Sequence, residues 1–112
     1  FFMKYFVYNN QRDGTCYHEF YKGKWNRWKH WKSDSIFLDD DYLFKGFSDA
    51  IKEIVPYYDS FGATKISIDQ WNKIGEIITA KDIESQEVYH EADLWLKEQL
   101  FHKHKCFTIL GI

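Results

Sequence analysis

The chain ends in the stretch CFTILGI, residues 106–112, and this stretch decides the fold that the sequence predicts. A strand with one solvated face alternates apolar and polar side chains, whereas this stretch is apolar on both faces. Such a run is typical of a central strand that is covered on each side. Because helices are predicted before it, the chain has to return at its end to a sheet that earlier residues begin.

Three helices are predicted upstream, because apolar side chains there recur at the spacing of one helix face. The first begins at the aspartates 39–41, which suit the positive end of a helix dipole, and stops at Pro56. The second opens with the capping box Ser67-x-x-Gln70, and Asp82 can cap the third. The predicted buried stripes are Leu43, Phe44, Phe47, Ile51, Ile54 and Val55, then Trp71, Ile74 and Ile78, then Val88, Ala92, Trp95, Leu96 and Leu100.

The N-terminal third predicts strands, because side chains alternate in residues 3–8 and again in residues 15–21. A turn-rich stretch separates the two, so we expect them to pair as an antiparallel hairpin. An irregular or short third strand is expected within residues 22–32. Residues 57–65 predict a loop, after which Lys65 and Ile66 add a short extended piece.

The predicted fold class is α+β: a single domain with a small, mostly antiparallel sheet, packed with about three helices. The N-terminal hairpin and the C-terminal strand are expected to form this sheet. The domain is expected to span residues 3–112, with Met3 as the natural start and Phe1 and Phe2 as a remnant of an expression vector. No apolar run approaches the length of a membrane span and no signal-like segment is present, so we expect a cytoplasmic protein.

The net charge of −2 conceals an uneven distribution of charge along the chain. Residues 1–32 carry seven Lys or Arg and two acids, whereas residues 33–101 carry fifteen acids and six lysines. A domain that binds nucleic acid is usually basic as a whole. The acidic middle of this chain therefore indicates a cationic partner at least as much as an anionic one.

The stretch KGKWNRWKHWK, residues 22–32, combines three tryptophans with five cations. This composition suits binding to single-stranded nucleic acid, or less readily to a membrane surface. The structural interpretation is preferred: Trp25, with Trp28 or Trp31, packs against the helices while the cations reach outward.

A metal site is conceivable at His102, His104 and Cys106, which would share one side of a strand, with His18 or Cys16 as a further ligand. Zinc sites normally come as spaced pairs, however, and cations after a helix already complement its dipole. No nucleophile motif and no glycine-rich phosphate loop is present in the sequence. We therefore expect no catalysis, no metal and no cofactor.

Several short segments together resemble small immunity proteins of bacterial polymorphic-toxin and contact-dependent growth inhibition systems. The segments are FYKGKW (20–25), YYDSFG (57–62), ISIDQW (66–71), DLWLKE (93–98) and FTILGI (107–112). The resemblance implies a cytoplasmic protein that binds one cognate toxin domain, frequently a nuclease, and blocks its active site. It supplies no motif that would fix the binding residues.

The partner-binding surface is therefore predicted from charge and aromatic clustering. A nuclease cleft is basic, so an inhibitor that covers it benefits from acidic side chains, and buried aromatic anchors are typical hot spots. The predicted set is Asp39, Asp40, Asp41, Tyr42, Tyr57, Tyr58, Asp59 and Phe61. Two alternatives stay open: a nucleic-acid-binding module that uses residues 22–32, and a small metal-dependent enzyme.

Overall fold

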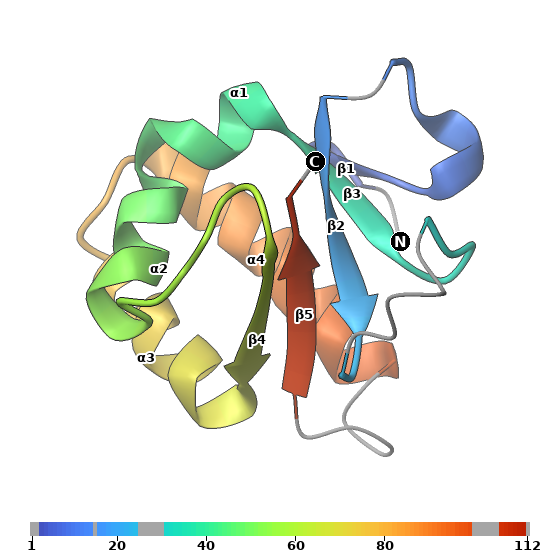
Figure 1. The fold of residues 1–112 in the computed structure, drawn as a ribbon. Helices are drawn as coiled ribbons and strands as arrows, with labels where there is room; N and C mark the ends of the chain where they lie inside the picture. The colour runs from blue at the N-terminus through green and yellow to red at the C-terminus, as the bar shows by residue number, and fades with distance from the viewer. Residues whose placement is uncertain (1–2, 15, 25–30, 100–105, 112) are drawn as a thin grey trace.

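The computed structural model describes residues 3–14, 16–24, 31–99 and 106–111 (Figure 1). Its centre is one antiparallel sheet in the order β1-β3-β2-β5-β4. The strands are β1 (Phe6–Val7), β2 (Tyr17–Lys22), β3 (Ile36–Asp39), β4 (Ala63–Ser67) and β5 (Cys106–Leu110). Helices lie against one face of this sheet, so the predicted α+β class is confirmed.

The last strand, β5, lies inside the sheet between β2 and β4, as its apolar pattern predicts. Phe107 and Ile109 belong to the core beneath the helices, while Thr108 and Leu110 are buried on the other face. Strand β4 was expected only as a short extended piece. It pairs with β5 along its whole length, from Ala63 opposite Leu110 to Ser67 opposite Cys106.

The predicted N-terminal hairpin is wrong, because β3 lies between β1 and β2. Phe6 of β1 pairs with Leu38 of β3, and the other side of β3 pairs with β2, where Leu38 lies opposite His18. The third strand is thus at Ile36–Asp39 and not within residues 22–32. The physical reason is burial: Ile36, Phe37 and Leu38 are buried on both faces, which requires an interior position.

A kinked helical segment follows β3 directly and is made of α1 (Asp40–Tyr42), η2 (Leu43–Phe47) and α2 (Ser48–Ile54). Asp39 caps it, since its carboxylate accepts a hydrogen bond from the Asp41 amide. Within η2, Gly46 has a φ of 134°, a conformation that favours glycine, and the regular helical turn is interrupted there. The predicted helix is confirmed, but Phe44 is half exposed and does not belong to its buried stripe.

The other two predicted helices are α3 (Ile68–Ile78) and α4 (Ile83–Gln99). The Ser67–Gln70 capping box is present, and Asp82 accepts a hydrogen bond from the Ser85 amide at the start of α4. Trp71 and Trp95 are both buried, as predicted. A short 3₁₀ turn, η1 (Asn9–Gln11), follows β1. Leu100 lies outside the described residues.

The face of the sheet opposite the helices carries Trp31, one of the two tryptophans of which at least one is predicted to join Trp25 against the helices. The Trp31 ring contacts Phe37 instead, at 6.2 Å between centroids, and the Arg12 guanidinium lies 3.4 Å above the Trp31 ring. The buried Glu19 carboxylate accepts hydrogen bonds from the amides of Trp31 and Lys32, at 2.6 and 3.1 Å. Trp31 therefore has a structural role on this face, while Trp25 and Trp28 lie outside the described residues.

Candidate functional site

A histidine, a carboxylate and a phenylalanine meet where β2 begins and α1 starts. His18 of β2 is buried, and its Nε2 atom contacts the carboxylate of Asp40 in α1. The rings of His18 and Phe44 of η2 pack in a T-shaped arrangement, with 5.6 Å between the ring centroids. Asp40 and Phe44, whose side chains reach the surface, are thus supported by the same buried ring.

The protonation of His18 decides the charge of this group. Burial lowers the pKa of His18 below its ordinary value of 6.5, and this effect outweighs the attraction of the Asp40 and Asp39 charges. The imidazole is therefore neutral at physiological pH and does not cancel the charge of Asp40. The Asp40 side chain is 41% exposed, so its negative charge is presented to solvent.

Tyr58 brings the loop before β4 to the same place. Its side chain is only 7% exposed, and its hydroxyl has no hydrogen-bond partner among the described residues. Burial raises the pKa of Tyr58 well above its ordinary range, and the nearby charges of Asp59 and Asp40 raise it further. The hydroxyl therefore stays protonated close to both carboxylates.

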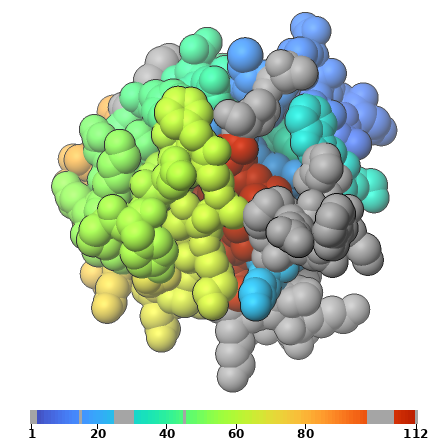
Figure 2. Space-filling model, in the orientation of Figure 1, coloured from blue at the N-terminus to red at the C-terminus, as the bar shows by residue number. Residues whose placement is uncertain are grey.

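The loop is held in this position by its own hydrogen bonds. The Asp59 carboxylate accepts from the Phe61 amide at 2.9 Å, and the Asp59 amide donates to the Thr64 hydroxyl at 3.1 Å. The Gly111 amide, just after β5, donates to the carbonyl of Gly62 at 2.8 Å. Figure 2 shows this segment in yellow-green beside β5 in red.

Four carboxylates therefore lie at one end of the sheet, and we call them the acidic edge: Asp39, Asp40, Asp41 and Asp59. Among the lysine and arginine side chains that the structure describes, none pairs with any of these four carboxylates. The described lysines that form ion pairs do so with Glu87, Asp34 and Asp93. The described cationic side chains thus leave the negative charge of the acidic edge uncompensated.

The structure separates the predicted aromatic residues. Phe61 is exposed beside the acidic edge, in the loop that packs on Gly111. Tyr57 is also exposed, but its hydroxyl accepts a hydrogen bond from Gln70 in the first turn of α3, beyond the far end of β4. Tyr42 turns toward Tyr5, at 5.0 Å between ring centroids, and Tyr58 is buried. Phe61 is therefore the predicted aromatic side chain that joins the acidic edge.

Sequence reasoning missed His18 and Phe44 as members of this site. The signal for Phe44 was its position four residues after Asp40, which places two side chains next to each other on a helix. The interruption of the helix at Gly46 was not visible in the apolar spacing, so Phe44 was assigned to the core. For His18 no signal is visible along the chain, since its contact with Asp40 depends on the pairing of β2 with β3.

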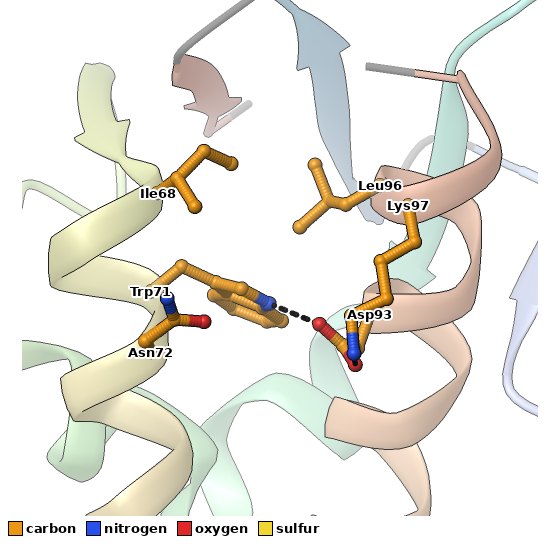
Figure 3. Close-up of a pocket in the computed structure, with 6 residues that line it drawn as sticks. All are labelled: Ile68, Trp71, Asn72, Asp93, Leu96 and Lys97. Carbon is orange, nitrogen blue, oxygen red and sulfur yellow. Dashed lines mark hydrogen bonds and ion pairs between the residues drawn. The ribbon is translucent and has the colours of Figure 1, made fainter. Parts of the chain in front are cut away.

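Apart from the acidic edge, a hollow lies between α3 and α4 and is shown in Figure 3. Its volume is about 140 Å³, and Ile68, Trp71 and Leu96 supply apolar atoms. The Trp71 indole N–H donates to Asp93 at 3.1 Å, and Lys97 pairs with the same carboxylate at 2.8 Å. The Trp71 indole and the Lys97 ammonium thus both bind the Asp93 carboxylate, and these three groups satisfy one another.

The metal site considered at His102, His104 and Cys106 falls largely outside the described residues. His102 and His104 lie outside them, while Cys106 begins β5. Among the residues that the structure describes, no three histidine, cysteine or acidic side chains are placed to hold a metal ion. The described helices include none that is long and apolar enough to cross a membrane.

Comparisons with known proteins identify no relative of this chain. No protein-family model matches the sequence, and neither a curated protein nor a solved structure does.

Proposed function

We propose that this protein is an immunity protein that binds and neutralises a cognate toxin domain of the nuclease type by covering its active site. The observation that supports the proposal most is the acidic edge. Its carboxylates come from two separate segments of the chain, form no ion pair with the described lysine and arginine side chains, and lie beside the exposed Phe44 and Phe61.

The physical argument is complementarity of charge. An enzyme that cleaves nucleic acid has to attract phosphate, so its cleft is cationic, and an inhibitor with an acidic surface approaches that cleft favourably. Charge accelerates association, whereas exposed aromatic side chains supply the desolvated contact that slows dissociation. The acidic edge offers both kinds of side chain within one surface.

The test needs the cognate toxin domain, which is to be sought in the reading frames beside this gene. Replacing Asp39, Asp40 and Asp41 with asparagine should keep the fold, because asparagine also caps helices well. Association with the toxin should slow tenfold or more at low salt. The variant and the parent should converge at several times physiological ionic strength, since salt screens the same charges that the substitutions remove.

A matched control removes three exposed acids elsewhere, by Glu53→Gln in α2 and Asp69→Asn with Glu76→Gln in α3. This control should associate within about threefold of the parent, because its charges lie outside the acidic edge. If the triple asparagine variant associates and protects cells as the parent does at every salt concentration, the acidic edge is not the contact surface.

The alternative function is a nucleic-acid-binding module at residues 22–32. The described residues of this segment, 22–24 and 31–32, support it less than the acidic edge supports an immunity protein. Lys22 and Lys32 both pair with Asp34, at 3.4 and 3.7 Å, and Trp31 is engaged by Arg12. Titration with single-stranded RNA separates the two functions. Tight binding that weakens steeply as salt rises would favour the nucleic-acid module.

A further inference from the structure

Asp40 and Phe44 form a pair within the acidic edge that differs from the other acids. They lie four positions apart on one helical segment, and both contact the buried ring of His18. His18 approaches the Asp40 Oδ1 atom, and the carboxylate remains 41% exposed. Phe44 is 49% exposed. The Asp40 carboxylate and the Phe44 ring are thus presented side by side above the buried ring of His18.

This combination fits a guanidinium group better than an ammonium group. A guanidinium is planar, donates several N–H groups in a fixed fork to a carboxylate, and stacks on an aromatic face. The same protein already shows such stacking, since the Arg12 guanidinium lies 3.4 Å above the Trp31 ring. A lysine ammonium could pair with Asp40 but would use the Phe44 face less well.

The hydroxyl of Tyr58 is an independent observation that points to a ligand here. It is buried, it has no hydrogen-bond partner among the described residues, and the charges of Asp59 and Asp40 act on it. Buried polar groups in native proteins are nearly always paired, so an unpaired one at a surface of uncompensated charge needs an explanation. The oxygen is covered in this structure, so an N–H donor seated between Asp40 and Asp59 would become its partner once the atoms that cover it move aside.

We infer that Asp40 and Phe44 form the anchoring site for an arginine side chain of the partner, with His18 as the residue that positions Asp40. The inference deepens the proposed function and rests on it for the identity of the partner as a toxin. The arginine site itself can be tested without the toxin.

The probe is N-acetyl-arginine amide, titrated into the full chain and followed by the amide resonances of the protein in solution. Saturable shifts should concentrate at residues 18, 40, 44 and 58, and N-acetyl-lysine amide should bind at least threefold more weakly. Asp40→Asn should weaken the arginine probe tenfold or more. Asp49→Asn, an exposed aspartate of α2 with the same change in charge, should leave its affinity within twofold.

A second variant keeps the test decisive should Asp40→Asn perturb the fold. Phe44→Leu retains the charge of the acidic edge and should weaken the arginine probe more than the lysine probe. Equal affinity for the two probes, or shifts spread over all acidic residues and unchanged by Asp40→Asn, would overturn the inference. If the probe binds as expected while Asp40→Asn still protects cells fully from the toxin, the arginine site stands and its assignment to the toxin contact fails.

Discussion

The imidazole of His18 contacts the carboxylate of Asp40, yet the pKa of His18 lies below its ordinary value. An acidic neighbour alone would raise the pKa of a histidine, so the loss of solvation on burial is the larger effect. At neutral pH His18 therefore adds no positive charge beside Asp40.

The stability of the protein should therefore depend on pH through His18. The unfolded chain takes up a proton at His18 near pH 6.5, whereas the folded chain does so only at lower pH. Its contribution to stability is thus fully present above pH 6.5 and is lost as pH falls through the lowered pKa of the folded state. In thermal unfolding from pH 7.5 to 5, His18→Gln should show a smaller drop in Tm than the parent. His90→Gln, at an exposed histidine of α4, should retain the parent's drop.

Glu91 should be a strong determinant of stability, because it secures the N-terminal segment to α4. Its buried carboxylate accepts hydrogen bonds from the amides of Lys4, Tyr5 and Phe6, at 2.9 to 3.2 Å. Glu91→Gln should lower the free energy of unfolding by about 2 kcal/mol, since it removes the charge from these bonds. Denaturant titration measures this loss, and hydrogen exchange should accelerate first at the three amides. Glu87→Gln, on the exposed side of the same helix, should change stability by less than about 0.5 kcal/mol.

Gly75 in α3 should resist replacement by alanine, although alanine favours a helix by about 1 kcal/mol. A Cβ atom at Gly75 would lie 2.3 Å from the Tyr89 hydroxyl, which donates to the Trp71 carbonyl at 3.1 Å. The Tyr89 ring also stacks on Trp71 at 4.3 Å between centroids, so it cannot move away freely. Gly75→Ala should therefore destabilise the protein by about 1–3 kcal/mol in denaturant titration.

Contact with Tyr89 can be tested as the cause of this destabilisation by making Gly75→Ala in a protein that also carries Tyr89→Ala. In Tyr89→Ala the space beside Gly75 is empty, and Gly75→Ala should then stabilise the protein. A destabilising effect of equal size in both backgrounds would show that contact with Tyr89 is not the cause.

Trp71 and Trp95 should both be essential to the core, since each is 1% exposed. Trp71 contacts Phe107 of β5 at 5.3 Å and Phe47 at 6.1 Å between ring centroids, so it joins α3 to the sheet. Truncation of either tryptophan to alanine should cost about 3–5 kcal/mol in denaturant titration, because a large cavity remains. Ile83→Ala, at an exposed position, should cost little by comparison. Losses below about 1 kcal/mol at both tryptophans would contradict this description of the core.

Much of the local structure could be predicted from the sequence because it depends on neighbouring residues. The helix start at the aspartates 39–41, the Ser67–Gln70 capping box and the buried stripe of α3 are confirmed. The interior position of β5 follows from side chains that are apolar on both of its faces. Each of these features depends on residues that are close together in the sequence. The spacing of residues was therefore sufficient to predict them.

The candidate site was predictable only in part. The charges of Asp39, Asp40, Asp41 and Asp59 were visible in the sequence, but Tyr57 lies toward the start of α3 and Tyr58 is buried. Clustering along the chain identified the acids because three of them are consecutive. It could not tell which neighbouring aromatic side chains point outward, since a loop has no regular period.

The sequence by itself determined the fold class, the helix starts and the sign of the charge in the middle of the chain. Only the tertiary structure decided that β3 lies between β1 and β2 and that His18 meets Asp40. An alternating pattern shows that a strand has a buried face, but any strand with a matching face can be its neighbour. The choice depends on which pairing buries Ile36, Phe37 and Leu38 together, and that is a property of the whole core.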